Sequence, residues 1–305
     1  MKVAVIGAGN VGATVAERIA EVDLADVVML DVIQGVPQGK ALDISQSGPI
    51  LDFGVKVTGT NDYRDIDGAA IVVVTAGFPR KPGMSRDDLV VANREVVASV
   101  AVEIRKHAPD SVVLMVTNPL DVMAYVAMKE TGFPRERVLG MAGVLDSARF
   151  RSFIAAELGV KPADVSAMVL GGHGDSMVPL ISHTTVGGVH VTDLVSTERL
   201  AAIVERTRTG GTEIVTLLGK GSAYYAPGAS AYLMVEAVVK DLRRVLPASV
   251  WAQGEYGIRD TFVGLPVVIG RHGCEKVVTM SLSEQELRDL RRSGDEVRKE
   301  IQKLS

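Results

Sequence analysis

The first half of the chain alternates short apolar runs with longer stretches of helical periodicity. Runs such as Val3–Ile6 and Ile71–Thr75 lack alternating polar positions, which is typical of strands buried on both faces of a parallel sheet. The stretches between them have helical spacing, and right-handed crossovers of this kind build a doubly wound sheet. The expected strands are Val3–Ile6, Val27–Leu30, Lys56–Thr58, Ile71–Thr75, Val112–Val116 and Val138–Leu139, and the expected helices are Val11–Glu21, Pro37–Ser47, Arg86–Lys106 and Leu120–Thr131.

After about Gly143 the pattern becomes a mixture of helices and strands without that regular alternation. The pair Gly187-Gly188 between two strand-like stretches predicts a hairpin turn. We therefore expect an α/β chain of two domains, a doubly wound domain over 1–143 and an α+β domain over 144–305, with a ligand cleft at their junction. In the second domain the expected helices are Asp146–Leu158, Ser196–Thr207, Gly211–Leu218, Ala229–Val245 and Ser283–Lys303, the last with a capping-box pattern, and the expected strands are Val165–Leu170, Val178–Thr185, Val189–Val191, Val250–Tyr256, Thr261–Ile269 and Lys276–Ser281.

Composition and charge exclude several classes of function. Of the 305 residues, 47% are hydrophobic and 23% are charged, as in an ordinary globular protein. The net charge of -4 gives no bulk attraction for nucleic acid or an anionic membrane, so an anionic ligand has to be held by local arginines. The single cysteine, Cys274, fits a reducing compartment. Because membrane-span, signal-peptide and metal-ligand patterns are all missing, we expect a cytoplasmic protein without membrane, nucleic-acid or metal partners.

A glycine-rich segment follows the first expected strand. Gly7–Gly12 reads GAGNVG, and Asp31 ends the next expected strand. With 31 glycines in the chain the spacing alone is weak, but a strand before it, a helix after it and an acid at this offset are typical of a Rossmann dinucleotide site. Gly7 permits a tight turn, Gly9 lets a pyrophosphate approach the backbone, and Gly12 lets helix pack on strand. Asp31 would bind both ribose hydroxyls and repel a 2′-phosphate, which favours NAD over NADP.

Two further segments carry acid–base chemistry. His173 lies between glycines in Leu170–Asp175, which reads LGGHGD, and Leu145–Arg151, LDSARFR, contains Asp146 and Arg149. A histidine positioned by a carboxylate, next to a guanidinium, can move a proton on a substrate anchored by its own carboxylate. Combined with a dinucleotide, this predicts hydride transfer on a small hydroxy acid. The remaining histidines are interpreted as structural: His107, His183, His190 and His272.

These motifs resemble the lactate/malate dehydrogenase superfamily, in the expected order along essentially the whole chain. The resemblance is strongest to its bacterial, malate-type branch. It implies NAD-dependent, reversible oxidation of (S)-malate to oxaloacetate. The segments that carry it are GAGNVG, the MLD ending at Asp31, AGFPRKPGMSRDDL (Ala76–Leu89), VTNP (Val116–Pro119), LDSARFR and GGHGD.

The resemblance assigns roles to individual residues. It makes His173 the general acid/base, with Asp146 holding the imidazole, and it places Arg149 on the C1 carboxylate of the substrate. Asn118 would bind the reacting oxygen, and Pro119 corresponds to a cis proline of the family. The implied cofactor-binding residues are Gly7, Ala8, Gly9, Asn10, Val11, Gly12, Asp31, Asn93, Val116, Thr117 and Asn118.

From the residues alone the loop Phe78–Leu89 is interpreted as a solvated basic loop before a helix; the resemblance implies instead a lid that carries two substrate-binding arginines. Arg86 would polarise the substrate carbonyl when the loop closes and excludes water. Arg80 stands where malate enzymes have arginine and typical lactate enzymes have glutamine, so it would bind the second carboxylate of oxaloacetate. Ala223 matches the small residue that leaves room for that group.

Two alternative functions stay open from the sequence. One is an NAD-dependent dehydrogenase of another 2-hydroxy acid such as lactate, which Arg80 disfavours. The other is an NAD-binding sensor without catalysis, which would not need His173 and Asp146. The family also suggests a homo-oligomer, with a tetramer favoured over a dimer; the apolar helix Ala229–Val245 could pack inside one subunit or between subunits.

Overall fold

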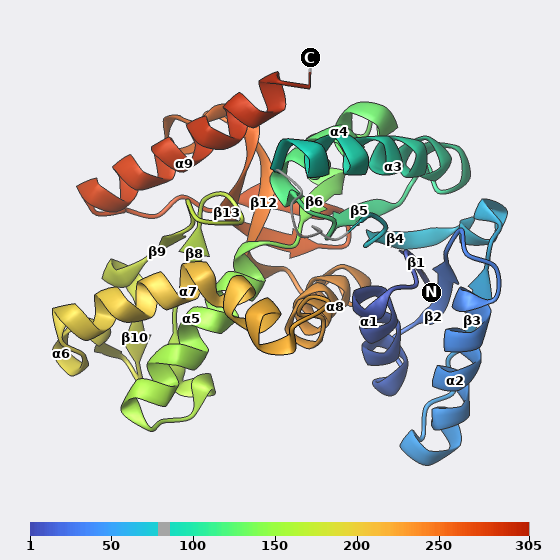
Figure 1. The fold of residues 1–305 in the computed structure, drawn as a ribbon, viewed down its shortest axis with the longest axis horizontal. Helices are drawn as coiled ribbons and strands as arrows, with labels where there is room; N and C mark the ends of the chain where they lie inside the picture. Colours follow the sequence, from blue (N-terminus) through green and yellow to red (C-terminus); the bar gives the residue numbers. More distant parts are fainter. Residues whose placement is uncertain (79–85, 305) are drawn as a thin grey trace. The chain divides into compact units, whose positions relative to one another are not determined.

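Six parallel strands form the centre of the N-terminal part of the fold. The computed structural model describes residues 1–78 and 86–304 (Figure 1). The strands lie in the order β6-β5-β4-β1-β2-β3, each parallel to its neighbours. Because the chain reverses its direction of travel between β1 and β4, this is a doubly wound Rossmann sheet, as predicted. The strands are β1 (Lys2–Ile6), β2 (Asp26–Leu30), β3 (Val57–Thr60), β4 (Ala69–Val74), β5 (Val112–Met115) and β6 (Val138–Gly140).

Helices cover this sheet in two groups. Helix α1 packs against α2 and α8, whereas α3 packs against α4, and right-handed crossovers place the two groups on opposite faces. A Cβ on Gly228 of α8 would lie 2.5 Å from Cγ2 of Thr14 in α1, so this glycine lets the two helices approach closely. The helices are α1 (Asn10–Glu21), α2 (Val36–Leu51), α3 (Arg86–His107), α4 (Leu120–Thr131) and α8 (Tyr225–Val239).

The expected helix Ala229–Val245 was placed too late in the sequence. The helix ends at Val239, because Asp241 and Arg243 have φ values of 52° and 50°, in the left-handed region. The apolar residues that follow belong to β12 (Arg244–Gln253). The apolar pattern used for the prediction therefore ran from the end of α8 into the start of β12.

The remaining elements are helices, the short strands of two small sheets, and the strands β13 and β14. The hairpin predicted at Gly187-Gly188 is present, because β10 pairs antiparallel with β11 and also with β7. Helix α5 packs against α7, and Phe150 and Ile154 of α5 are fully buried in the core that they share. The elements are α5 (Gly143–Leu158), β7 (Val165–Ser166), β8 (Val169–Leu170), β9 (Val178–Pro179), β10 (Thr185–Val186), β11 (Val189–His190), α6 (Val191–Leu194), α7 (Thr197–Leu218), β13 (Arg259–Gly270), β14 (Gly273–Val277) and α9 (Glu284–Gln302).

Several predicted boundaries in this part of the chain were wrong. The expected strand Val178–Thr185 is interrupted by a 3₁₀ turn over Ile181–His183, and Val165–Leu170 is split into β7 and β8. The two helices predicted on either side of residue 210 are a single helix, α7, because the glycine pair lies within it instead of ending it. The last predicted strand, Lys276–Ser281, is β14, which ends at Val277.

Helix α9 begins as the sequence predicted. The Ser283 hydroxyl accepts a hydrogen bond from Glu286 N, and the Glu286 carboxylate accepts one from Ser283 N, which completes a capping box. Among the helices that the structure describes, none has the length and apolar composition needed to cross a membrane.

The residues that contact one another most closely divide into two units. The first unit contains Met1–Met141, Ala223–Arg244 and Val268–Lys276, and the second contains Ala142–Ser222, Val245–Val267 and Val277–Ser305. Two segments that the sequence analysis assigned to the second domain thus group with the first unit. The linear division at residue 143 stays a prediction about the chain's organisation.

Candidate active site

The turn between β1 and α1 has the shape of a phosphate-binding loop. Gly7 has a φ of 103°, and a Cβ there would lie 2.6 Å from Ala76 N. A Cβ on Gly12 would lie 2.0 Å from the Gly7 carbonyl oxygen, whereas a Cβ on Gly9 would meet no atom within 4 Å. The turn is therefore closed at its base and open at Gly9. Gly9 is also the N-cap of α1 and provides no side-chain cap, so the first amides of the helix can bind an anion.

Asp31 lies directly after β2 and is tied to this turn. Its Oδ2 accepts a hydrogen bond of 2.7 Å from Ala8 N, and its Oδ1 accepts one of 3.0 Å from Ile33 N. Two backbone donors thus orient the carboxylate beside the glycine turn, where the ribose of a dinucleotide lies in Rossmann domains. The binding of ribose hydroxyls expected of Asp31 stays a prediction.

Asn93 of α3 connects the segments that follow β4 and β5. Its side chain is fully buried. Its Oδ1 accepts a 2.7 Å hydrogen bond from Phe78 N, and its Nδ2 donates to the carbonyl oxygens of Phe78 and Asn118 at 3.1 Å and 2.7 Å. Asn93 therefore positions the peptide of Asn118 through the backbone. The cofactor contact expected of Asn93 itself stays a prediction.

The segment Val116–Pro119 is also hydrogen-bonded to the chain that follows β4. The buried Thr117 hydroxyl donates a 2.7 Å hydrogen bond to the Ala76 carbonyl oxygen. A Cβ on Gly77 would lie 2.6 Å from Cγ2 of Thr117, so only glycine allows this approach. The Asn118-Pro119 peptide bond is cis, as expected from the sequence, and the Asn118 side chain is exposed.

In the second unit, α5 and the loop after β8 bring the predicted acid–base pair together. Nδ1 of His173 lies 2.9 Å from Oδ2 of Asp146, whose side chain is 2% exposed. Nη1 of Arg149, one turn later on α5, lies 3.4 Å from Oδ1 of the same carboxylate. The His173 side chain is 15% exposed, so the imidazole remains accessible to solvent while Asp146 orients it through Nδ1. This is the arrangement of a histidine that exchanges a proton while a buried carboxylate stabilises its charged form.

Arg149 is largely buried, and only part of its guanidinium is hydrogen-bonded. Burial lowers the pKa of its guanidinium below the ordinary value, against the opposing effect of Asp146. Its Nε is buried and has no hydrogen-bond partner among the described residues. An unsatisfied buried donor is costly, and a substrate carboxylate would supply the missing acceptor in bidentate geometry.

A feature that the sequence analysis missed makes room for this guanidinium. Gly210 and Gly211 lie inside α7, where glycine costs about 1 kcal/mol relative to alanine. A Cβ on Gly210 would lie 3.3 Å from Cδ of Arg149, and a Cβ on Gly211 would lie 3.5 Å from its Nη2. The glycine pair therefore lies against Arg149 without a side chain of its own in between. Glycines in the middle of an otherwise regular helical pattern were the signal that could have identified it.

Some predicted site residues lie outside what the structure describes. Arg80 falls within 79–85, and the backbone of Arg86 begins α3 but its side chain is not among the described ones. The lid expected over Phe78–Leu89 is therefore described only at its two ends. Ala223 lies between α7 and α8. In the described part of the chain, no group of three or more His, Cys, Asp or Glu side chains could hold a metal ion.

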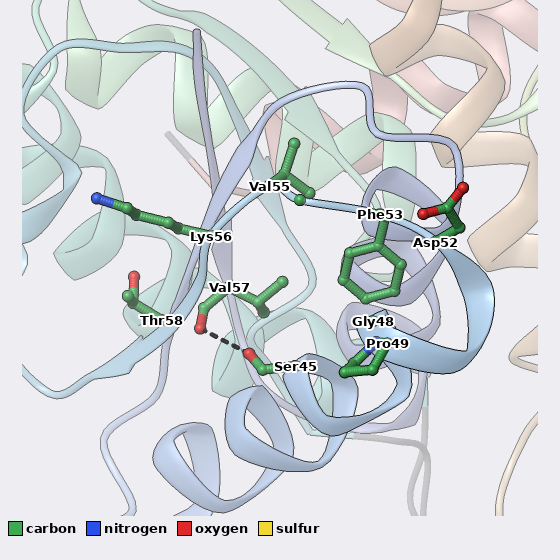
Figure 2. Close-up of a pocket in the computed structure, with 10 residues that line it drawn as sticks. Ser45, Gly48, Pro49, Asp52, Phe53, Val55, Lys56, Val57 and Thr58 are labelled. Carbon is green, nitrogen blue, oxygen red and sulfur yellow. Dashed lines mark hydrogen bonds between the residues drawn. The ribbon is translucent and has the colours of Figure 1, made fainter.

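A hollow of about 490 Å³ lies at the C-terminal end of α2 and the start of β3, and Figure 2 shows residues that line it. Phe53 lies over Gly48 and Pro49, and Lys56 extends away from them. None of the predicted catalytic, substrate or cofactor residues lines this hollow. It therefore adds nothing to the chemistry assembled above.

Comparison with known proteins agrees with this geometry. Residues 1–140 match the family described as lactate/malate dehydrogenase, NAD binding domain, and residues 143–305 match lactate/malate dehydrogenase, alpha/beta C-terminal domain. The chain belongs to the lactate/malate dehydrogenase family. It is an NAD-dependent oxidoreductase, with a Rossmann domain that binds NAD and a C-terminal α/β domain.

Individual members of the lactate/malate dehydrogenase family match over nearly the full length. The malate dehydrogenase of Chloroherpeton thalassium is 53% identical over 100% of this chain and 99% of the relative. A malate dehydrogenase structure from Cryptosporidium parvum has a TM-score of 0.97 at 44% identity, covering 99% of this chain and 98% of that one. The lactate dehydrogenase of the same organism, solved with lactic acid and nicotinamide adenine dinucleotide, has a TM-score of 0.96 at 42% identity, with 99% and 97% covered.

The first unit fits the NAD that the family binds. The uncovered face at Gly9 gives space for a pyrophosphate, and the uncapped start of α1 supplies amide donors. The first turn of α1 contains no acidic side chain that would repel phosphate. Asp31 is hydrogen-bonded to Ala8 N of the same turn, so a carboxylate that could accept from ribose hydroxyls lies beside these amides.

Proposed function

We propose that this chain is an NAD-dependent malate dehydrogenase, which interconverts (S)-malate and oxaloacetate. The observation that carries the proposal is the 2.9 Å pair of His173 and the buried Asp146, with Arg149 on the same carboxylate. The full-length similarity to malate dehydrogenases at about half identity supports the choice of substrate.

In the proposed reaction the side chains of this chain bind the substrate and move one proton. NAD, when bound, supplies the acceptor for the hydride that leaves C2 of malate. Nε2 of His173 accepts the proton of the C2 hydroxyl, because Nδ1 is engaged with Asp146. The Asp146 carboxylate holds the ring in the required tautomer and stabilises the imidazolium that forms. In the reverse direction the same imidazolium returns the proton to the carbonyl oxygen.

Substrate binding is assigned to three arginines and one amide. Arg149 binds the C1 carboxylate, which is common to every 2-hydroxy acid. Arg80 binds the second carboxylate, which malate has and lactate lacks. Arg86 polarises the carbonyl of oxaloacetate, and Asn118 hydrogen-bonds to the reacting oxygen next to the nicotinamide.

The cellular setting is a further part of the proposal. We infer a cytoplasmic enzyme of the tricarboxylic acid cycle that works as a homo-oligomer, with a tetramer favoured over a dimer. The net charge of -4 supports a small-molecule substrate rather than nucleic acid or an anionic membrane surface as the partner.

Replacing Arg80 with glutamine tests the choice of substrate. The variant removes the charge and keeps a polar side chain of similar length. We expect kcat/KM for oxaloacetate to fall by about 100-fold or more, since losing one partner of a desolvated ion pair costs about 3–5 kcal/mol. Activity on pyruvate should stay the same or rise, because Arg80 is unpaired when pyruvate binds. Both activities are measured from NADH absorbance at a fixed salt concentration.

The matched control is Arg64→Gln, at an exposed arginine that pairs with Asp62, and it should change neither activity. Arg149→Gln should instead reduce both activities, because both substrates use that anchor. If the Arg80→Gln variant retains its full preference for oxaloacetate, the assignment of Arg80 is wrong. If the unmodified protein prefers pyruvate, the function is that of a lactate-type dehydrogenase.

A further inference from the structure

The loop that carries His173 is fixed where it leaves the sheet. Gly171 and Gly264 of β13 exchange two backbone hydrogen bonds of 2.9 Å each. Just before the loop, Val169 N donates a 2.8 Å hydrogen bond to the hydroxyl of Ser147, the residue that follows Asp146 on α5. This hydrogen bond fixes the start of the loop relative to α5, the helix that carries Asp146. These contacts end before His173 itself.

Ser293 continues the support across the loop. It lies in the middle of α9 and is fully buried. Its Oγ accepts a 2.8 Å hydrogen bond from Gly172 N and donates a 2.9 Å hydrogen bond to Oγ of Ser176. The two partners lie on either side of His173 in the sequence. One hydroxyl therefore ties together both ends of the segment that presents the imidazole.

The backbone is shaped to admit this hydroxyl. Gly171 has a φ of 84°, and a Cβ there would lie 2.9 Å from Oγ of Ser293. A side chain at position 171 would therefore push the hydroxyl away from Gly172. Helix α9 also packs against β9, the strand that follows the loop, so its position is set independently of the substrate.

We propose that Ser293 is a positioning residue for proton transfer, which holds the 172–176 segment so that His173 keeps its hydrogen bond to Asp146. The inference rests on the proposed role of His173 as the general acid/base. Ser293 does not reach the substrate. Its loss should loosen the imidazole and slow the proton transfer, while the carboxylate anchor at Arg149 and the NAD site of the first unit remain intact. A role in folding alone would lower the amount of folded enzyme without changing turnover per folded molecule.

The test compares Ser293→Ala with Ser293→Cys. Alanine removes both hydrogen bonds, and cysteine keeps a side chain of similar size with much weaker hydrogen bonding. We expect kcat per NADH-binding site to fall by about 10- to 100-fold in both, the scale of a small misplacement of a catalytic group. KM for oxaloacetate and Kd for NADH should stay within about threefold of the unmodified enzyme. The isotope effect on kcat, with NADH deuterated at the transferred hydrogen, should rise because chemistry becomes slower than product release.

Two further variants complete the experiment. Ser176→Ala removes only the acceptor and should lower kcat less than Ser293→Ala does. Ser230→Ala is the control, because this buried serine in α8 donates only to Ala226 O within its own helix, and it should leave kcat unchanged. Active-site titration with NADH corrects each rate for the folded fraction.

The outcomes separate this inference from the proposed function. Unchanged kcat per binding site in both Ser293 variants, or an activity loss that only tracks the folded fraction, overturns the positioning role and leaves the role of His173 intact. If His173→Asn itself turns over oxaloacetate normally, the proposed function fails, whatever the Ser293 variants do.

Discussion

The glycine turn of the first unit and the His173 site of the second unit are built in opposite ways. The turn at Gly7–Gly12 uses backbone atoms from one short stretch of chain, and the side chains of Asp31 and Thr75 hydrogen-bond to that backbone. The His173 site uses side chains, and it joins α5 to the loop after β8 through Asp146. The glycine turn depends on positions that have no side chain, whereas the His173 site depends on contacts between side chains.

This difference predicts how each site responds to substitution. A backbone site is damaged by added atoms, because a Cβ on Gly12 would lie 2.0 Å from the Gly7 carbonyl oxygen. A side-chain site is damaged by removed atoms, because the partners of a removed group lose their hydrogen bonds or ion pairs. The two functions, cofactor binding and proton transfer, should therefore be separable by mutation.

The largest effect should come from His173→Asn. Asparagine cannot act as the general acid/base, so kcat for oxaloacetate should fall by about 100-fold or more. NADH affinity, followed by fluorescence titration, should be unchanged because the residues proposed to bind the cofactor lie in the first unit. Asp146→Asn should be milder, since the imidazole remains but its tautomer is no longer enforced. A joint loss of turnover and NADH binding would contradict the separation of the two sites.

Cofactor choice should depend on Asp31. The unmodified enzyme should prefer NADH over NADPH by at least about 100-fold in kcat/KM, or about 2.7 kcal/mol, because the carboxylate repels a 2′-phosphate. Asp31→Ser should narrow this gap. Asp31→Asn keeps an acceptor for Ala8 N and loses the charge, so it isolates the electrostatic part. Equal use of both cofactors by the unmodified enzyme would refute the role assigned to Asp31.

Gly9→Ala should weaken NADH binding without affecting folding. Its Cβ meets no protein atom within 4 Å but occupies the space assigned to the pyrophosphate. We expect Kd for NADH to rise about tenfold, the cost of one misplaced methyl group, with an unchanged Tm. Gly39→Ala in α2 has equally open surroundings and serves as the control. If the Gly9 variant binds NADH normally, the pyrophosphate lies elsewhere.

Gly211→Ala should show that the second site also needs an absent side chain next to Arg149. The new Cβ would contact Nη2 of Arg149 at 3.5 Å, which is an ordinary packing distance, so the fold should persist. We expect KM for both oxaloacetate and pyruvate to rise about three- to tenfold, because the methyl covers one face of the shared anchor. Thr209→Ala, at an exposed position of the same helix, is the control. A rise for only one substrate would argue against Arg149 as the common anchor.

The smallest effect concerns the start of α9. Burial raises the pKa of Glu286, but hydrogen bonds from Ser182 and Ser283 outweigh it and hold the pKa below the ordinary value of 4.5. The ionised carboxylate therefore stabilises the fold above that value, and the contribution is lost as the pH falls through the folded-state pKa. Glu286→Gln should cost about 1 kcal/mol at pH 7. The difference from the unmodified protein, measured by urea unfolding, should shrink toward acid pH; a difference independent of pH would exclude this carboxylate as its source.

The local spacing of residues along the chain was enough to predict several elements and motifs of this protein. The parallel strands, the turn at Gly7–Gly12 with Asp31, and the capping box of α9 each depend on residues within one or two elements. The short-range rules of strand, turn and helix start therefore suffice for them. The motifs around His173 and Asp146 also predicted acid–base chemistry, although no local pattern predicts the distance between these two side chains.

Tertiary structure decided the features that depend on long-range contacts. Two helices were predicted with a gap over residues 208–210, but α7 is continuous where it packs against α5, and this places Gly210 and Gly211 against Arg149. Asn93 was expected to touch the cofactor, and only the fold shows its amide bound to the backbone of Asn118. No sequence pattern pointed to Ser293, because a serine on an amphipathic helix has no predicted role by itself. Its role depends on Gly172, over a hundred residues earlier, whose backbone N–H donates to its hydroxyl in the folded chain. Hydrogen bonds between such distant segments follow from the packing of whole elements, and no local pattern encodes them.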